Sequence, residues 1–259
     1  IDAWWKTSSF TSSIDVSSLT VNDGFVIHGI NVNDYTGDQV SSGDINGDGI
    51  DDFIISAYTD TNGVNAGSVY VLFGQTANQT STVDLSALNG SNGFVINGIN
   101  ANDLTGSTVS FSNDINGDGF GDILISADDA SPNGKSDAGQ SYVVFGASSF
   151  STTLELSSLD GNNGITLNGA TAKDDAAIST AGDINGDGFD DLIVGAEDHT
   201  NFGNYGAGSS FLLFGSSSLA STIELSEINA SNGFIFLGQN FEDYSGTNVS
   251  QAGDVNGDG

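Results

Sequence analysis

The sequence predicts an all-β protein built from repeated four-stranded antiparallel sheets, the blades of a β-propeller. Two observations lead to this fold class. Four short sequence words recur in fixed order about every 70 residues, and short apolar runs are bounded by Gly, Asn, Asp and Ser along the chain. Such runs between turn residues are typical of strands, and no stretch has the sustained 3.6-residue apolar period of a helix.

The repeat is defined by the hexapeptide Asp-Ile-Asn-Gly-Asp-Gly. It begins at Asp44, Asp114 and Asp183, and a fourth copy with Val in second place begins at Asp254, so the spacings are 70, 69 and 71 residues. A period of this length indicates that each unit is one supersecondary element packed on its neighbours. The other words are Gly-Phe-Val-Ile and its variants at 24–27, 93–96, 164–167 and 233–236, an aromatic run ending in Phe-Gly at 69–74, 141–146 and 210–215, and an acid between apolar residues at 83–85, 154–156 and 223–225.

We divide the chain into complete and partial units. Ser12–Leu19 matches the end of a unit, and Gly259 lies inside the fourth hexapeptide, so we expect the chain to be a fragment of a longer protein. Three complete units are too few to close a ring of the usual blade number, so we expect an open arc. The boundaries are residues 1–23 for the tail of a preceding unit, 24–92, 93–163 and 164–232 for the three complete units, and 233–259 for a truncated fourth.

Four strands are expected in each unit. A short strand precedes the hexapeptide, an apolar run follows it, and the Phe-Gly and Gly-Phe-Val-Ile words supply the other two. Gly, Asn and Ser form the turns between them, and the single proline, Pro132, is placed in a loop. The first strand is centred on Val40, Val109, Ile178 and Val249, and the second covers residues 53–57, 123–127 and 192–196.

Composition narrows the classes of partner. The chain has 34 acidic residues, three lysines and no arginine, which gives a net charge of -31. This surface repels phosphate groups, so nucleic acids and anionic membranes are excluded or disfavoured as partners, whereas divalent cations are favoured. The absence of cysteine excludes disulfides and thiolate zinc sites, and no apolar run approaches the ~20 residues needed for membrane insertion.

The nine residues that begin with each hexapeptide carry the ligand types of a calcium site. Oxygen-bearing side chains occupy positions 1, 3, 5 and 9, and the backbone carbonyl of position 7 adds another oxygen. Hard oxygens in a flexible loop suit Ca²⁺ better than Mg²⁺, zinc or copper, so we expect one Ca²⁺ per complete loop, three in all. The expected ligands are Asp44, Asn46, Asp48, Ile50 and Asp52; Asp114, Asn116, Asp118, Phe120 and Asp122; Asp183, Asn185, Asp187, Phe189 and Asp191; and, in the truncated fourth loop, Asp254, Asn256 and Asp258.

Several other kinds of acidic loop share part of this pattern. Hairpin turns with Asn-Gly or Asp-Gly and solvated carboxylates contain the same dipeptides, but turn chemistry does not require an acid at position 9 each time. An EF-hand or a dockerin module is disfavoured because position 12 holds Ile55, Ile125 and Val194 instead of Glu, and a strand follows instead of a helix. The motif recurs every ~70 residues, not every nine as in an RTX β-roll.

Together the loop and the strand order resemble the FG-GAP repeat of integrin α-chain propellers and their bacterial relatives. The resemblance spans nearly the whole chain. It implies a seven-bladed propeller, calcium in the hairpin loops, and adhesion or ligand recognition. The FG element matches Thr36-Gly37, Thr105-Gly106 and Ser245-Gly246 without the Phe and is missing at Asp174-Asp175-Ala176-Ala177, and the GAP element matches Ser56-Ala57-Tyr58, Ser126-Ala127-Asp128 and Gly195-Ala196-Glu197 without the Pro.

No catalytic constellation emerges from the sequence. His28 replaces Asn97, Asn168 and Leu237 of other units and is interpreted as a tolerated polar variant, and His199 is interpreted as solvated in a variable loop. We therefore expect a non-catalytic extracellular or cell-surface module for adhesion or ligand recognition. The alternatives are a structural spacer of a large surface protein, or an accessory propeller of an enzyme whose catalytic domain lies elsewhere.

The expected ligand surface is the end of the blades opposite the calcium loops. Successive hairpins of an antiparallel sheet fall at alternate ends, so the connection after the hexapeptide strand lies there. Three such segments differ in length and sequence on otherwise similar scaffolds, which favours recognition of a protein or glycan, although segments without constraint would also vary. They are Tyr58–Ala66, Asp128–Ala138 and Glu197–Ala207.

Overall fold

The computed structural model describes residues 24–59, 65–75, 82–174 and 176–252, and these residues confirm the predicted fold class. They form four β-sheets, and their helical segments are single 3₁₀ turns. These turns are η2 (Leu85–Ala87), η3 (Pro132–Gly134), η4 (Leu156–Ser158) and η5 (Leu225–Glu227). The strands are β1 (Val26–His28), β2 (Val40–Gly43), β3 (Asp52–Ala57), β4 (Ser68–Leu72), β5 (Thr82–Asp84), β6 (Gly93–Asn97), β7 (Thr105–Ser112), β8 (Asp122–Ala127), β9 (Gln140–Val144), β10 (Thr153–Glu155), β11 (Gly164–Asn168), β12 (Ala176–Gly182), β13 (Asp191–Ala196), β14 (Ser209–Leu213), β15 (Thr222–Glu224) and β16 (Gly233–Leu237).

Each blade is built around four antiparallel strands, as predicted. The first complete blade has the order β10-β6-β4-β3-β2, and the second has β15-β11-β9-β8-β7. A third sheet has the order β12-β13-β14-β16, and β1 pairs with β5 in a two-stranded sheet. The blades therefore cross the unit boundaries drawn from the sequence, because β6, at the start of the second unit, completes the sheet of β2, β3 and β4.

A fifth, parallel strand on the outside of the blade was not predicted. β10 pairs with β6 in the register Val95↔Thr153, and both strands belong to the unit that follows β2, β3 and β4. The side-chain amide of Asn97 donates to Glu155 Oε1 at 2.8 Å and fastens the end of this pair. β15 on β11 and β5 on β1 repeat the arrangement. Each blade is thus interlocked with the unit that follows it.

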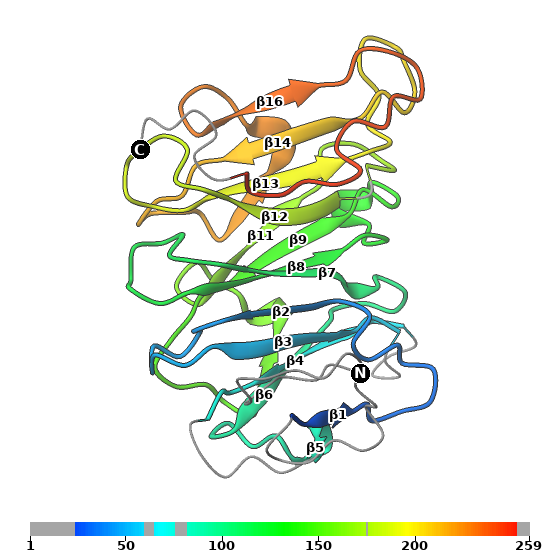
Figure 1. Cartoon of the computed structure of the whole chain (residues 1–259). Coiled ribbons are helices and arrows are strands. Elements are labelled where there is room, and N and C mark those ends of the chain that lie inside the picture. The colour runs from blue at the N-terminus through cyan, green and yellow to red at the C-terminus, as the bar shows by residue number, and fades with distance from the viewer. Residues whose placement is uncertain (1–23, 60–64, 76–81, 175, 253–259) are drawn as a thin grey trace, which may run out of the picture.

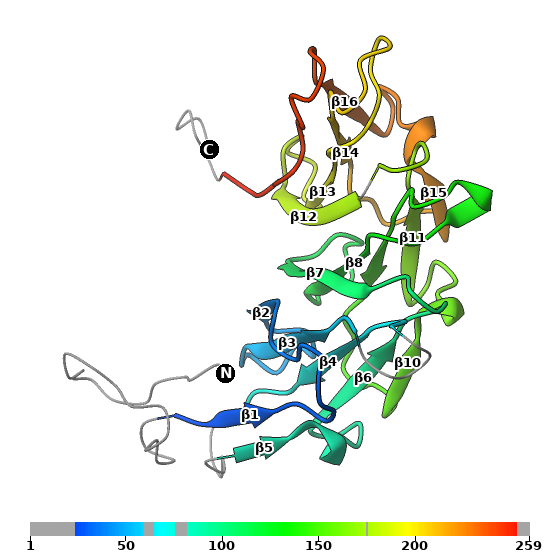
Figure 2. The same ribbon diagram turned by 90° about the vertical axis from the view of Figure 1, so that its right-hand side faces the viewer.

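The blades stack side by side in an open arc (Figures 1 and 2). Their first strands β2, β7 and β12 lie next to one another on the inside of the arc. β8 is buried along its whole length because both faces of the strand are covered, although Asp122 and Ser126 are polar. Ile123 packs in the cluster shared with the first blade, and Leu124 packs in the cluster shared with the third sheet; both are 0% exposed.

The loops fall at two ends of the blades. The β2–β3, β7–β8 and β12–β13 loops carry the hexapeptides and lie at one end, the left-hand side of Figure 1. The β3–β4, β8–β9 and β13–β14 loops and the connectors between blades lie at the other. One predicted strand is not formed: Val249 lies outside any strand.

Candidate metal centre

The first residue of each loop organises the backbone around its own carboxylate. Asp44 Oδ1 accepts hydrogen bonds from the backbone N–H groups of Gly47 and Asp48 at 2.8 and 3.1 Å, and Oδ2 accepts from Gly49 at 2.8 Å. Asp114 and Asp183 accept the equivalent three bonds at 2.6–3.1 Å. The sequence coils here because a short acid can bond the amides three to five residues ahead of it.

The side chains at positions 3 and 5 turn into the same coil. The Asp48 N–H donates to both Asp44 Oδ1 and Asn46 Oδ1, so these two oxygens lie side by side. Asp48 Oδ1 in turn accepts from the Ile50 N–H at 2.9 Å. Left-handed backbone at Gly47 (φ 74°) and Gly49 (φ 83°) makes the coil possible. The other two described loops repeat this pattern of bonds.

The acid at position 9 has a structural role that the sequence did not reveal. Asp52 is 0% exposed, its Oδ2 accepts from the Ile45 N–H at 3.1 Å, and its Oδ1 accepts from the Gly74 N–H at 2.8 Å. Asp122 and Asp191 make the same two bonds. Each one clamps its loop to the end of the third strand of the blade. A carboxylate oxygen can accept more than one bond, so the clamp leaves capacity for a cation.

This clamp explains the Phe-Gly word. A Cβ atom on Gly74 would lie 2.3 Å from the Asp51 carbonyl oxygen, and one on Gly146 would lie 2.2 Å from the Gly121 carbonyl oxygen. The glycine lets the end of the third strand approach the loop closely enough to donate its N–H to the buried acid.

Negative charge accumulates in each loop. Burial raises the pKa of Asp52 to about 6, and the carboxylates of Asp48 and Asp44 add to the rise, against the opposing effect of its two backbone hydrogen bonds. Burial likewise raises the pKa of Asp122 to about 8, and the pKa of Asp191 is raised for the same reasons. A bound cation would favour the ionised form of all these groups.

The donor set fits a calcium ion. Each complete loop supplies three carboxylates and one amide as hard oxygen donors, and Asn46 Oδ1 already lies beside Asp44 Oδ1. In the described residues no three His, Cys, Asp or Glu side chains surround a common point as bound ligands would, because the loop oxygens face their own backbone amides. The position-7 residues Ile50, Phe120 and Phe189 are half-buried. The fourth loop, with Asp254, Asn256 and Asp258, lies outside the described residues.

Neighbouring loops contact one another. A Cβ atom on Gly47 would lie 2.6 Å from the Phe120 ring of the next loop, and one on Gly117 would lie 2.4 Å from the Phe189 ring. The Ala147 N–H donates to the Ile45 carbonyl at 3.2 Å, which ties the first loop to the second blade. At Gly47 and Gly117 the position-4 glycine is therefore required by its neighbour as well as by its own φ.

The opposite end of the blades uses a second set of acids, which sequence reasoning missed. Asp34 Oδ2 accepts from the Asn31 N–H at 2.8 Å and Oδ1 from the Thr36 N–H at 3.0 Å, which shapes the connector before β2. Asp103, Asp174 and Asp243 hold the equivalent connectors. Their separation from the following hexapeptide varies between 9 and 11 residues, but each lies ten residues after the first glycine of the Gly-Phe-Val-Ile word, and this fixed spacing is the signal that could have revealed them.

The interpretation of His199 as a solvated side chain is wrong. Its Nδ1 lies 2.9 Å from Asp174 Oδ1, and its side chain is only 14% exposed. The ring also packs edge-on against Phe211. The acid of the connector fixes this histidine, so it fastens the β13–β14 loop to the connector before β12. His28 is exposed at the end of β1, opposite Asp84.

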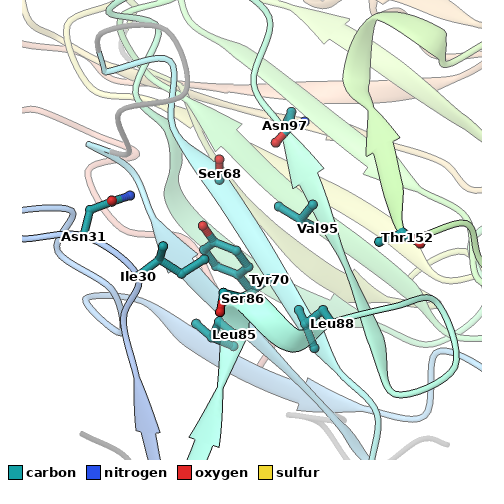
Figure 3. A pocket seen from close by; sticks show the side chains of 10 residues that line it. All are labelled: Ile30, Asn31, Ser68, Tyr70, Leu85, Ser86, Leu88, Val95, Asn97 and Thr152. Carbon is teal, nitrogen blue, oxygen red and sulfur yellow. The ribbon is translucent and has the colours of Figure 1, made fainter.

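A hollow of about 500 Å³ lies beside the β3–β4 end of the first blade (Figure 3). Its walls combine apolar and polar side chains from β4, β6, η2 and the connector after β1. The lining residues are Ile30, Asn31, Ser68, Tyr70, Leu85, Ser86, Leu88, Val95, Asn97 and Thr152.

Comparison with known proteins agrees with this architecture. The FG-GAP repeat family matches residues 36–72, 105–144 and 176–213, each match covering one hexapeptide loop and the strands around it. The chain is an FG-GAP repeat protein. It is also 30% identical over 131 residues to integrin alpha-PS2 of Drosophila melanogaster, a match that covers 48% of this chain and 8% of the integrin. Within the residues that the structure describes, this FG-GAP chain has no helix long and apolar enough to span a membrane.

Proposed function

We propose that this FG-GAP chain is a non-catalytic, calcium-binding propeller module that recognises a protein or glycan ligand outside the cell or at its surface. The observation that carries the proposal is the threefold repetition of one oxygen-lined coil. The same acids and amides recur at the same positions of three loops, with the same backbone hydrogen bonds.

Electrostatics supports calcium as the ion. The three complete loops hold eleven of the chain's carboxylates at one end of the blades, nine of them at positions 1, 5 and 9, within a net charge of -31. Three Ca²⁺ ions would lower this repulsion, and the buried acids at position 9 would be kept ionised. Extracellular calcium modules bind with dissociation constants of roughly 10⁻⁴ to 10⁻³ M, so such sites fill outside the cytoplasm.

The end opposite the calcium loops supports ligand recognition. Tyr35 and Tyr58 stack there with ring centroids 5.5 Å apart, and the Phe202 and Phe241 side chains are 80% and 60% exposed. Exposed aromatic side chains on a rigid scaffold provide contact area at low cost in conformational entropy. The hollow beside Tyr70 adds a concave surface with both polar and apolar walls (Figure 3).

Thermal unfolding in calcium and in chelator tests the metal site. At a hundredfold excess of ion over the dissociation constant, each occupied site adds about 2.7 kcal/mol to the free energy of unfolding. We expect Asp48→Ala to lose one site's share of this calcium effect, whereas Asp51→Ala, an exposed acid of the same loop at position 8, retains it. Equal melting temperatures of the unmodified chain in calcium and in chelator would reject the proposal.

Exchange of loops tests the ligand surface. Replacing Glu197–Ala207 with the shorter Tyr58–Ala66 segment should reduce binding to a protein or glycan found by array screening, while calcium binding stays unchanged. A structural spacer would show no specific ligand on such arrays. Binding that survives the exchange of all three loops but is lost on replacing Asp51 would place recognition at the calcium end instead.

A further inference from the structure

Hydrogen bonds between blades join the first hexapeptide loop to the second. The Ile45 N–H of the first loop donates to the buried Asp52 carboxylate at 3.1 Å, and the Ile45 carbonyl accepts from the Ala147 N–H at 3.2 Å. Ala147 follows Gly146, whose N–H donates to Asp122 of the second loop at 3.0 Å. One short segment of the second blade therefore holds the first loop and the buried position-9 acid of the second loop at the same time.

The same link joins the second loop to the third. The Ile115 N–H donates to Asp122 at 2.8 Å, and the Ile115 carbonyl accepts from the Ser216 N–H at 3.0 Å. The residue before Ser216 is Gly215, whose N–H donates to Asp191 of the third loop at 2.9 Å. A continuous series of hydrogen bonds and peptide units therefore passes through all three position-9 acids, which are also expected calcium ligands.

The residue at position 2 of the first and second loops is fixed to the next blade by packing as well. Ile45 and Ile115 are both 0% exposed. Ile45 packs in the apolar cluster between the first and second blades, and Ile115 packs in the cluster between the second blade and the third sheet. Neither loop can therefore shift at this point without moving the blade that follows it.

A second contact runs directly between the coils of neighbouring loops. The Phe120 ring of the second loop lies against Gly47 of the first. The Gly47 N–H donates to Asp44 at 2.8 Å, and the Phe120 N–H donates to Asp118 at 2.9 Å. Phe189 of the third loop makes the equivalent contact with the second. The residues that touch between loops are thus held in place by acids that are expected to bind calcium.

We propose, on the basis of the calcium sites proposed above, that the three described loops bind the ion cooperatively. Each loop is coupled to its neighbours, and the first is coupled to the third only through the second. An ion in one loop draws the acids at positions 1, 5 and 9 together and thereby fixes the residues at positions 2 and 4 that the next blade contacts. The next ion enters a loop that is already partly ordered, so its binding costs less conformational entropy.

Direct repulsion between bound ions has the opposite sign. Each ion removes part of the negative charge that attracts the next one, so repulsion alone gives progressively weaker sites. Salt at 0.15 M screens exposed charges over a Debye length of ~8 Å, whereas interactions through the buried position-9 acids are screened much less. Cooperative binding at this salt concentration therefore identifies the contacts between loops as its cause.

Calcium titration followed by NMR tests the coupling loop by loop. The N–H groups of Gly47, Gly117 and Gly186 donate to the position-1 acids of their own loops, so their amide signals report the three sites separately. In the unmodified chain at 0.15 M salt, all three signals should follow curves steeper than a single-site isotherm. Asp118→Ala, in the middle loop, should raise the half-saturating calcium concentration at both Gly47 and Gly186 by about fivefold or more.

The first loop provides the matched control. Asp48→Ala removes the equivalent acid, but among the described loops the first contacts only the second. The half-saturating concentration should therefore rise at Gly117 and change much less at Gly186. Spectra in chelator complete the control: unchanged positions of these two glycine signals show that the substitution has not distorted the remaining loops.

Removing one link tests its role without removing any ligand. Ser216→Pro deletes the N–H that donates to the Ile115 carbonyl, so it should weaken the coupling between the second and third loops and leave that between the first and second unchanged. Ser217→Pro, at a position whose N–H makes no hydrogen bond within the described part of the chain, is the control. Undiminished coupling in folded Ser216→Pro would show that this hydrogen bond is not the link.

The outcomes separate this proposal from the calcium sites themselves. Three independent single-site curves would overturn the coupling and leave the calcium sites standing. The same holds if Asp118→Ala leaves the half-saturating concentrations of its neighbours unchanged or lowers them. Glycine signals that do not respond to calcium would reject the calcium sites, and the coupling with them.

Discussion

The two ends of the blades achieve their tight backbone turns in different ways. At the calcium end, every left-handed residue of the loops is a glycine, such as Gly47 and Gly49. At the opposite end, eleven described non-glycine residues adopt positive φ, among them Tyr35, Phe202 and Tyr244. Side chains that must hold such angles cost stability and often mark functional surfaces.

Both ends use aspartate carboxylates to bind backbone amides, but with different density. Asp34 shapes its connector alone, whereas the loop at 44–52 places Asp44, Asp48 and Asp52 within nine residues. One carboxylate is satisfied by two amides, but three together retain unneutralised charge. The same turn device is therefore repeated densely enough at one end to form the proposed cation site, whereas at the other end it occurs singly among exposed aromatic side chains.

The largest effect on stability is expected from removing the buried acid at position 9, which clamps the loop, and not from removing an exposed acid that is expected to bind calcium. Asp122→Ala leaves the buried N–H groups of Ile115 and Gly146 without their acceptor, so the free energy of unfolding should fall by roughly 2–5 kcal/mol in calcium and in chelator alike. Asp118→Ala, at an exposed position of the same loop, should lower stability mainly in calcium. Urea unfolding under both conditions measures this. Similar losses for both variants in chelator would show that position 9 is not a clamp.

A pH effect of a few kcal/mol is expected in chelator. The folded pKa values of Asp122 and Asp52 are raised to about 8 and about 6 from an ordinary value of 3.8, so the native state binds more protons than the unfolded state. The resulting stability is complete below pH ~4 and is lost as the pH rises through 6 and 8. Asp122→Asn should flatten the profile of unfolding free energy between pH 5 and 8. A flat profile for the unmodified chain would contradict the raised pKa values.

A smaller effect on stability is expected when alanine replaces glycines that have the same backbone conformation but different neighbours. Gly47 and Gly49 have φ of 74° and 83°, so alanine costs each about 1 kcal/mol for its backbone. Only alanine at 47 meets the Phe120 ring, so it should cost a further ~1–3 kcal/mol. Gly186→Ala, with φ 75° and nothing within 4 Å, is the control and should match Gly49→Ala. Equal losses of unfolding free energy at 47 and 186 would show that the contact with the Phe120 ring does not contribute to stability.

The smallest effect on stability is expected at the end of the blades opposite the hexapeptide loops. Lys135 forms a partly exposed ion pair with Glu224 at 3.4 Å and donates to the Gly169 carbonyl at 3.0 Å. Lys135→Ala should therefore lower the free energy of unfolding by about 1 kcal/mol or less, and 1 M salt should reduce the difference. Lys173→Ala, with no ion pair among the described side chains, serves as the control. A loss of several kcal/mol would show that side chains at this end contribute as much to stability as the buried acids of the hexapeptide loops.

The sequence predicted most of the fold but only part of the candidate site. Periodic words located the four antiparallel strands because turn residues bound each apolar run. The fifth strand was missed because it is only three residues long, Thr82–Asp84 in the first unit, and pairs in parallel with a strand far away in the chain. Nothing in a single sequence encodes such a pairing.

The roles of single acids were harder to predict than their presence. The hexapeptide and Asp52 were assigned as calcium ligands from their oxygens alone, and that assignment stays a prediction. That Asp52 is buried and clamps Gly74 depends on the fold around it. His199 was misjudged because its partner, Asp174, lies in a different connector, 25 residues away.

Calorimetric titration of calcium into the chelator-treated chain tests the central claim most directly. The account predicts three ions for the three complete loops, with two for Asp187→Ala and three for the control Asp190→Ala, whose carboxylate bonds to Asn113 outside the coil of its own loop. Dissociation constants should fall in the range of roughly 10⁻⁴ to 10⁻³ M. No saturable binding, or the same number of ions for the unmodified chain and Asp187→Ala, would contradict the assignment of these loops as calcium sites.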